Sequence, residues 1–350
     1  MEARHRILRT LLGGIHATRL DRVFDAFTDA RGAIITLHHV RDERRKGFAP
    51  NAHLSVTPEF LDSAITDIRA RGIDIVSMDE IGERIRSKAA GRFVAITFDD
   101  GYRDNAENAR PVLEAHDAPY CIYVTTGFVQ RTAFLWWEAL EALIRQKDWL
   151  MVDTDAGPID LDCSDANAKA NSYERLIDHF KTTVPENRVT DAVRSLCWQH
   201  QVDTARIGDT QIMSLAEVVE IASTELCTIG AHTATHRNLA RLPLDDAREE
   251  ITRGARELES ITGVAPRHFA YPYGFKAAAG AREFSLVRDL GFRTGVTTRR
   301  GVLYQEHADH LTALPRISFN GYYQSERYVM PLLSGLPTGF ARRFRKLDVA

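Results

Sequence analysis

Short apolar runs alternate with amphipathic segments along most of this chain, and no other feature limits its possible folds as much. The runs with the length of buried strands are 33–37, 73–76, 93–97, 120–124, 225–229, 268–270 and 292–296. The segments between them have the spacing of helices that bury one face. Strands that are joined through helices lie parallel, because each crossover returns the chain to the same end of the sheet. The sequence therefore predicts an α/β fold with a parallel sheet.

The number of strands favours a closed barrel over an open, doubly wound sheet. A length of 350 residues suits one (β/α) barrel with insertions. We expect an irregular (β/α) barrel of about seven strands in residues 31–320, a helical segment in residues 1–30, and a C-terminal helix with a basic tail in residues 321–350. Between about residues 131 and 223, helical segments follow one another without strands, which predicts a helical insertion.

Four polar motifs fall where predicted strands end. They are His38-His39, Asp99-Asp100, His232 with His236, and Tyr271-Pro272-Tyr273-Gly274. In parallel α/β sheets and barrels, functional side chains gather at the carboxyl ends of the strands. We therefore expect these motifs to share one cleft, with the insertion placed between the acidic motif and the histidine motif.

The acidic motif and the histidine motif together contain the ligands of an open metal site. Two imidazoles and one carboxylate leave coordination positions for water and substrate. The second carboxylate, next to the cation, stays ionised and can accept a proton from water. Taken singly, each motif has a plainer interpretation, as a turn, a helix cap or core histidines. Their occurrence together at successive strand ends favours the metal site.

Charge and cysteine content point away from several other classes of protein. Lys and Arg (45) nearly balance Asp and Glu (48), so no whole-molecule field favours nucleic acid as a partner. No apolar run approaches the roughly 18 residues of a transmembrane helix, and Met1 to Ala17 lack the continuous apolar stretch of a secretion signal. The four cysteines share no close spacing, as expected of reduced, structural thiols. We expect a cytoplasmic protein.

The end of the chain, Arg342 to Lys346, is locally basic. A solvated tail explains it, and so does peripheral contact with a membrane surface or a partner.

The set Thr97-Phe98-Asp99-Asp100-Gly101, His232-Thr233-Ala234-Thr235-His236 and Tyr271-Pro272-Tyr273-Gly274 resembles the motifs of the NodB-homology polysaccharide deacetylases, carbohydrate esterase family four. The resemblance covers roughly residues 33–319. It implies an irregular (β/α) barrel and metal-dependent hydrolysis of an N-acetyl group on a sugar. By position it makes Asp99 the general base and Asp100, His232 and His236 the metal ligands. The backbone N–H of Tyr273 would stabilise the oxyanion, and His38 matches a histidine often found after the first strand.

The chain departs from this family pattern at two positions. The third motif commonly begins with an arginine two places before the proline, where this chain has Ala270. A late Leu-x-His motif usually supplies the protonating histidine, and the matching segment here, Leu314-Pro315-Arg316, carries arginine instead. We hypothesise that Arg316 acts as a charge near Asp99, and that His38 or His39 protonates the leaving amine.

The predicted substrate is an N-acetylated sugar of a polysaccharide, an oligosaccharide or a lipid-linked precursor. Tyr271, Pro272, Trp136 and Trp137 are the predicted substrate contacts, although packing of a buried helix also explains the two tryptophans. The expected cofactor is one divalent metal ion, zinc first, with cobalt, nickel and manganese also suited to the ligand set. Two other functions fit the sequence: hydrolysis of a small non-sugar amide or cyclic imide, and carbohydrate binding by a protein that has lost catalysis.

Overall fold

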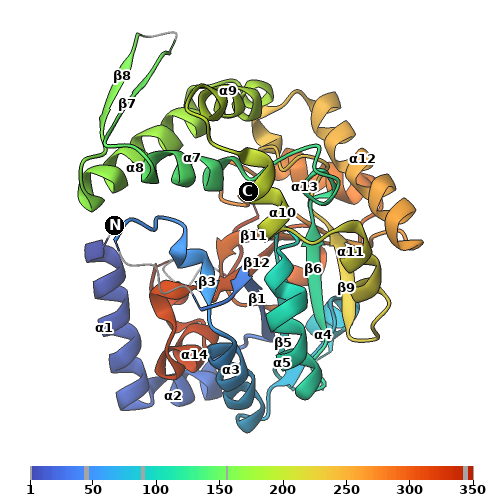
Figure 1. Cartoon of the computed structure of the whole chain (residues 1–350). Coiled ribbons are helices and arrows are strands. Elements are labelled where there is room, and N and C mark those ends of the chain that lie inside the picture. The colour runs from blue at the N-terminus through green and yellow to red at the C-terminus, as the bar shows by residue number, and fades with distance from the viewer. Residues whose placement is uncertain (1, 43–46, 88–90, 155–156, 342–345, 350) are drawn as a thin grey trace.

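Seven parallel strands form the centre of the molecule. A computed structural model of the chain describes residues 2–42, 47–87, 91–154, 157–341 and 346–349. The seven strands are β1 (Gly32–Leu37), β5 (Phe93–Phe98), β6 (Tyr120–Val124), β9 (Cys227–Ala231), β10 (His268–Ala270), β11 (Thr294–Arg300) and β12 (Leu314–Ser318). Helices surround them (Figure 1).

The strands close into an irregular barrel, as the sequence predicts. Their order around the ring is β1-β12-β11-β10-β9-β6-β5, and β5 pairs back to β1. The irregularity lies at two seams. β9 and β10 share a single registered pair, Ala231 with Phe269, and the register of β11 on β12 shifts between Val296 and Arg300. The short strand β4 (Asp74–Ile75) adds to β5 outside the ring.

The alternation of side chains along each strand separates two cores. On β5, Phe93 and Ala95 belong to a cluster inside the barrel, whereas Val94, Ile96 and Phe98 pack in the larger core beneath the helices. Because successive strand residues point to opposite faces, Thr97 and Asp99 continue the inward row.

The pairing register aligns the carboxyl ends of neighbouring strands. Leu37 of β1 lies opposite Phe98 of β5, and Val124 of β6 lies opposite Ala231 of β9. The residues that follow these strands therefore emerge at one end of the barrel.

The outer layer is made of helices whose ends follow sequence signals. Thr57 caps α3 (Pro58–Ala70) by accepting a hydrogen bond from Phe60 N–H, and Gly263 closes α12 (Leu244–Thr262) in the left-handed conformation. The other helices of this layer are α4 (Ile81–Arg86), α5 (Arg110–Ala115), α11 (Leu215–Ala222) and α13 (Ala281–Asp289). A π-helical turn, η3 (Asn105–Ala109), leads into α5.

Short elements complete the connections between the strands and these helices. They are the strands β2 (His39–Val40) and β3 (Ser55–Val56) and the 3-10 turns η1 (Ala52–Leu54), η2 (Met78–Glu80), η4 (Leu239–Arg241), η5 (Gln305–Asp309) and η6 (Gly321–Tyr323).

Helices from the two ends of the chain pack together beside the barrel. The helix α1 (Glu2–Thr18), followed by α2 (Leu20–Phe27), lies against α14 (Glu326–Leu333), which α15 (Leu336–Ala341) follows (Figure 1). Leu12, Tyr323 and Tyr328 form a small separate core between them. The basic residues 342–345 lie outside the described residues. Among the residues that the structure describes, no helix combines the length and the apolar character needed to cross a bilayer.

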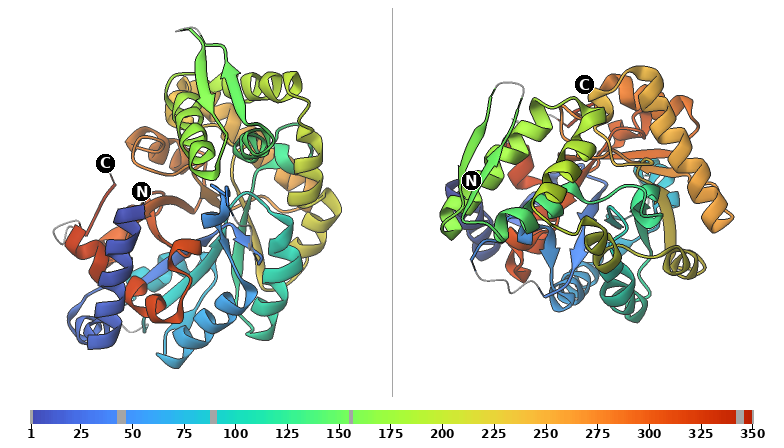
Figure 2. Two further views of the ribbon diagram at one scale, coloured as in Figure 1. Left: turned by 60° about the vertical axis from the view of Figure 1, so that its left-hand side comes forward. Right: turned by 45° about the horizontal axis from the view of Figure 1, so that its top comes forward.

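The inserted region covers one end of the barrel, and it is not wholly helical. It contains α6 (Thr126–Val129), α7 (Trp136–Arg145), α8 (Ala166–Thr182), α9 (Glu186–Gln199) and α10 (Thr204–Gln211). Between α7 and α8, the strands β7 (Trp149–Val152) and β8 (Ile159–Asp162) form an antiparallel hairpin that projects from the molecule (Figure 2). This hairpin was not predicted from the sequence, although apolar and acidic residues alternate along β8.

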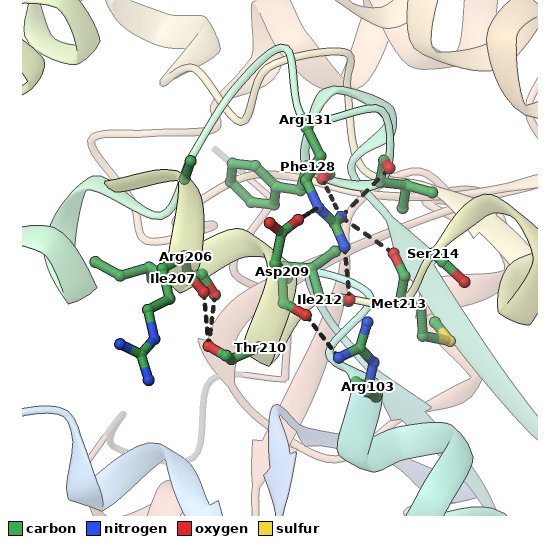
Figure 3. A network of polar contacts seen from close by, with 12 residues as sticks. Arg103, Phe128, Arg131, Arg206, Ile207, Asp209, Thr210, Ile212, Met213 and Ser214 are labelled. Atoms are coloured by element: carbon green, nitrogen blue, oxygen red, sulfur yellow. Dashed lines mark hydrogen bonds and ion pairs between the residues drawn. The ribbon is translucent and has the colours of Figure 1, made fainter. Parts of the chain in front are cut away.

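Arg131 fastens the inserted region to the barrel. It forms an ion pair with Asp209 of α10 at 2.9 Å, and its Nη1 and Nη2 donate to the carbonyls of Phe128 and Ile212 at 2.7 and 3.1 Å (Figure 3). Arg103, at the start of the segment leading into α5, donates to the Asp209 carbonyl at 2.6 Å. The end of the insertion is thereby fixed to two loops at the carboxyl ends of β5 and β6.

Candidate active site

A cavity of about 460 Å³ lies between the carboxyl ends of the strands and the inserted helices. This volume is typical of small-molecule sites. The predicted site residues that line it are His38, Asp99, Asp100, Trp137, His232, His236 and Tyr273. The motifs expected to share a cleft do so.

Asp100, His232 and His236 bring three ligand atoms together. His232 Nε2 and His236 Nε2 lie 3.4 and 3.3 Å from Asp100 Oδ1, and all three side chains are buried. Asp100 Oδ1 accepts no hydrogen bond from the described residues, so a buried acceptor faces two ring nitrogens. A carboxylate and two imidazoles are ligands that a divalent metal ion accepts, so the residues present fit such an ion.

Neighbouring groups orient His232. Its Nδ1–H donates to the Ala270 carbonyl at 2.7 Å, and its own carbonyl accepts from Thr125 Oγ1 at 2.8 Å. Because Nδ1 carries the proton in this hydrogen bond, Nε2 keeps its lone pair and faces Asp100. This Nδ1–H tautomer is the one that metal ligation through Nε2 needs.

A helix and a carboxylate support the loop between the two histidines. Glu250 of α12 accepts hydrogen bonds from the backbone N–H and the hydroxyl of Thr235 at 2.9 and 2.8 Å. Gly254, one turn further along α12, lies so close that a Cβ there would come within 2.6 Å of the Thr233 carbonyl carbon. The backbone of α12 therefore forms the floor on which this loop rests.

Burial and the neighbouring charges shift the pKa values of these three residues in opposite directions. Burial alone would raise the pKa of Asp100, but the two histidines outweigh it and hold that pKa far below its usual range. Burial lowers the pKa of His236 to about 3, so this ring is neutral at neutral pH. Burial also depresses the pKa of His232, yet the nearby carboxylates of Asp100 and Asp99 raise it overall. The site favours positive charge next to Asp100.

Asp99 is paired with Arg316 inside the barrel. Arg316 Nη1 donates to Asp99 Oδ1 at 2.8 Å and Nη2 donates to Oδ2 at 2.6 Å. Arg316 also donates from Nε to the Thr297 carbonyl at 2.9 Å and from Nη1 to Thr97 Oγ1 at 3.1 Å. Both partners are buried, and such a two-pronged pair fixes the plane of the carboxylate. The structure places Arg316 where the sequence hypothesis puts a charge.

This pair keeps Asp99 ionised. Burial alone would raise the pKa of Asp99, but the charge and the hydrogen bonds of Arg316 outweigh burial and lower it. Each carboxylate oxygen has two lone pairs. Oδ2 also accepts from Thr36 Oγ1 at 3.5 Å, so among the described contacts Oδ1 is the oxygen that keeps a lone pair for a proton from water.

The turn that carries Tyr273 is strained. Tyr273 and Gly274 have φ angles of 62° and 59°, and a Cβ on Gly274 would lie 2.6 Å from Thr298 N. Thr298 N–H donates to the Gly274 carbonyl at 3.0 Å, and its hydroxyl donates to the Tyr273 carbonyl at 2.7 Å. Within the described part of the chain, the Tyr273 N–H meets no acceptor.

Strained backbone recurs at the other site motifs. Asp100, Thr233 and His236 also have positive φ, at 75°, 64° and 60°. Such conformations cost about 1–3 kcal/mol each and collect where function requires them.

The two adjacent histidines after β1 point to different places. His38 lines the cavity, and burial lowers its pKa against the opposing charges of Asp99 and Asp100. His39 is fully buried outside the cavity lining, where its Nδ1 bonds Asp104 Oδ2 at 2.6 Å and its ring lies 3.6 Å from that of Tyr102. Of the two candidate proton donors, only His38 has access to a substrate.

Two of the predicted substrate contacts face the protein core, which differs from the expectation. Tyr271 is buried, and its hydroxyl donates to the Thr312 carbonyl at 2.7 Å. It follows Ala270, which faces the inside of the barrel, so strand alternation turns Tyr271 to the helix layer. Pro272 is likewise buried outside the cavity lining.

Of the two tryptophans of α7, one lines the cavity and the other is packed in the interior. Trp137 lines the cavity, 5.0 Å from the His236 ring between centroids. Trp136 is buried behind the cavity and donates from Nε1 to the Tyr273 hydroxyl at 3.1 Å. Trp136 therefore supports Tyr273 from behind and does not reach the cavity itself.

One wall of the cavity was not foreseen from the sequence. It comes from α8, through Ala170, Tyr173, Glu174, Ile177 and Lys181, and from the loop that carries Asn51 and His53. Tyr173 joins the two parts by donating its hydroxyl to Asn51 Oδ1 at 2.9 Å. The amphipathic pattern of α8 predicts burial of one face, but nothing local shows that part of this face borders a cavity.

Barrel, buried triad and paired carboxylate define the class of protein as a hydrolase suited to a divalent metal ion. Comparisons with known proteins agree with this assignment. The family model described as polysaccharide deacetylase matches residues 86–152 and 196–295. A sequence comparison with curated proteins finds no significant match.

Several solved structures share the fold. The Streptococcus pyogenes deacetylase PplD in complex with acetate is 17% identical, with a TM-score of 0.55 over 86% of this chain and 97% of that one. IcaB from Ammonifex degensii is 18% identical, with a TM-score of 0.53 over 87% and 98%. The BpsB deacetylase domain from Bordetella bronchiseptica is 16% identical, with a TM-score of 0.50 over 83% and 97%. At these identities the likeness concerns the fold.

Over the residues that the family model matches, which make up less than half of the chain, the protein is similar to the polysaccharide deacetylases, a family of hydrolases. The family model covers the acidic motif, the histidine motif and the Tyr-Pro-Tyr-Gly motif. The match therefore includes these cavity-lining residues: Asp99, Asp100, Trp137, His232, His236 and Tyr273.

Proposed function

We propose that this protein removes N-acetyl groups from a glycan with the help of one divalent metal ion held by Asp100, His232 and His236. The observation that carries the proposal is the convergence of a buried metal triad and a separately paired carboxylate in one cavity. Zinc is the metal expected first, and cobalt, nickel and manganese suit the same ligands. The substrate would be an oligosaccharide, a polysaccharide or a lipid-linked precursor.

In this scheme, the residues that hold the metal ion are different from the residue that acts as the general base. When bound, a divalent cation would polarise the acetamide carbonyl and lower the pKa of water. Asp99 would accept the proton of a water molecule as its oxygen adds to the carbonyl carbon. Arg316 would act as a positioning residue, because it fixes the plane of the Asp99 carboxylate and keeps it ionised.

Tyr273 and His38 would complete the reaction. The Tyr273 N–H, which has no acceptor among the described residues, is suited to donate to the carbonyl oxygen as negative charge develops on it. His38, whose lowered pKa favours the neutral ring, would first take up the proton that Asp99 removes from water and then donate it to the nitrogen as the C–N bond breaks. The products are acetate and the free amino sugar. Trp137 offers an aromatic face to a pyranose ring in the cavity.

Two expectations about where the protein acts in the cell remain predictions. They are a cytoplasmic location and contact of the basic tail with a membrane surface, both of which would suit a lipid-linked intermediate.

Acetate release is the direct test of the proposed function. Purified protein is loaded with zinc, cobalt, nickel or manganese and mixed with N-acetylated oligosaccharides. Release of acetate together with a free amine supports the proposal. Turnover of cyclic imides without acetate release would favour the small-amide alternative, and glycan binding without any hydrolysis would favour the binding protein.

A further inference from the structure

Lys181 is a cation in the cavity, and no carboxylate among the described residues pairs with it. It lies in the last turn of α8, is half-buried, and lines the cavity opposite the strand ends. Its Nζ lies 5.5 Å from the centre of the Tyr273 ring, whose centroid is 5.0 Å from that of His236. The amine and the candidate metal ligand His236 therefore lie beside the same tyrosine ring.

The acidic groups around this cavity are engaged elsewhere or exposed. Asp99 is held by Arg316, and Asp100 faces the two histidines. Glu186, which borders a small adjoining cavity with Lys181, pairs with Arg241 at 3.0 Å and accepts from Asn238 N–H at 2.8 Å. Glu174 also lines the cavity, but it is exposed and lies two turns before Lys181 on α8.

The face of Tyr273 compensates only part of the charge of Lys181. A cation over an aromatic ring gains about 0.5–2 kcal/mol, and the ring accepts no full hydrogen bond from the three N–H groups of the ammonium. Burial lowers the pKa of Lys181, which agrees with an amine removed from water and given no anion in exchange. His53, also in the cavity wall, has its pKa lowered by burial and, to a smaller extent, by the charge of Lys181.

We infer that Lys181 forms an anion subsite, and that the preferred substrate carries a negatively charged group within one sugar residue of the N-acetyl group. This inference rests on the proposed function and narrows its substrate class. The shared chemistry is an oxyanion, either the carboxylate of a uronic acid or a phosphate ester. A charge-assisted pair in a sheltered cavity would distinguish such a glycan from a neutral one.

The test compares matched pairs of glycans. One pair is a tetrasaccharide of alternating N-acetylhexosamine and hexuronic acid and the same tetrasaccharide with its carboxylates reduced to alcohols. An N-acetylhexosamine 6-phosphate and its unphosphorylated form provide the phosphate arm. Binding is measured by calorimetry on the metal-loaded Asp99→Asn variant, and kcat and KM for acetate release are measured on the otherwise unaltered enzyme.

Three substitutions are introduced in both backgrounds. Lys181→Met removes the cation, and Lys181→Arg keeps the charge. Lys169→Met is the control, because it removes a lysine from the same helix that donates to the Lys147 carbonyl at 2.6 Å, outside the cavity lining. Thermal melts confirm that each variant is folded.

We expect Lys181→Met to weaken binding and raise KM for one of the charged glycans by roughly 10- to 100-fold, the range of a hydrogen bond to a charged group. For the matched neutral glycan, binding and KM should change less than 3-fold. Lys181→Arg should keep most of the preference for the charged glycan over the neutral one. Lys169→Met should change binding and KM for neither glycan. The arm that responds identifies carboxylate or phosphate. Equal effects of Lys181→Met on charged and neutral glycans, or no effect on either, would overturn the subsite.

The readouts also keep the two proposals apart. Lys181-dependent binding of a charged glycan without acetate release from any sugar would support the subsite and count against deacetylation. Acetate release that does not depend on Lys181 for either charged glycan would keep the deacetylase and remove the subsite.

Discussion

Arg316 of β12 donates two parallel hydrogen bonds to Asp99, the residue after β5, at 2.8 and 2.6 Å, across 217 residues of sequence. Both side chains belong to rows that face the inside of the barrel. The cation that fixes the proposed base therefore comes from a strand two places around the ring, on the far side of β1. Ala270, where the family commonly has an arginine, accepts the Nδ1–H of His232 through its carbonyl.

Replacing Arg316 should change the pH profile as well as the rate. Because Arg316 lowers the pKa of Asp99, Arg316→Gln should raise that pKa and move the acid limb of kcat/KM to higher pH. Arg316→Lys should shift the limb less, since the charge stays but the paired geometry is lost. The measurement is kcat/KM for acetate release across pH 4 to 9. An unmoved acid limb in the Gln variant would contradict the positioning role.

The same pair should affect folding stability. Removing one partner of a buried ion pair costs about 3–5 kcal/mol, so Arg316→Gln should lower the free energy of unfolding by this order. The folded-state pKa of Asp99 is depressed, so the stabilisation is present above the unfolded pKa of about 3.9 and is lost as the pH falls through the folded value. Urea unfolding at pH 7 and pH 3 checks the sign. A wild-type advantage over Arg316→Gln that grows on acidification would contradict it.

Loss of the metal ion, by chelation or by substitution of its three proposed ligands, should destabilise the protein. Alanine at Asp100, His232 or His236 should reduce metal content and lower affinity by about 100-fold or more. A metal present at 100 times its Kd stabilises the wild type by about 2.7 kcal/mol, which chelation should abolish. Elemental analysis and thermal melts with and without chelator provide the readouts. A triple variant that still binds one equivalent would place the metal elsewhere.

A substitution that touches no ligand should weaken the same site. Gly254→Ala would place a Cβ 2.6 Å from the Thr233 carbonyl carbon and 2.8 Å from Ala234 N, so the loop between His232 and His236 must shift. We expect a 10-fold or greater loss of metal affinity. Gly14→Ala in α1 is the matched control, because its Cβ would meet nothing within 4 Å and alanine favours a helix. Equal metal affinity in both variants would remove the role given to α12.

The two neighbouring histidines should give different outcomes. His38→Gln should lower kcat about 10²- to 10⁴-fold with metal content unchanged, because the proposed proton donor is lost. His39→Gln should lower the melting temperature instead, because it disturbs the 2.6 Å bond to Asp104, with little change in kcat of the folded enzyme. Steady-state kinetics and melts of both variants decide. A larger loss of kcat in His39→Gln would reverse the assignment.

The parts of the site predicted from sequence are those that depend on local patterns. Strand length, glycine turns and the spacing of His232 and His236 identify the barrel and bring the triad together. Strand alternation, applied one residue further, also accounts for Tyr271 and His39, which follow inward-facing neighbours and turn to the helix layer.

The rest depends on how distant segments pack. Lys181, Tyr173 and Asn51 meet at the cavity because an inserted helix lies over the barrel end, and helical periodicity specifies only which face of α8 is buried. The positive φ angles at Thr233, His236 and Tyr273 fall on residue types that rarely adopt them, so the sequence predicts none of this strain.

Acetate release by Asp99→Asn tests the central claim most directly, because this substitution removes the base and keeps all three metal ligands. With a metal content equal to that of the wild type and a cooperative melt, the variant should lose at least about 10²-fold in kcat on an N-acetylated oligosaccharide. Wild-type acetate release by a metal-loaded Asp99→Asn protein would contradict the account.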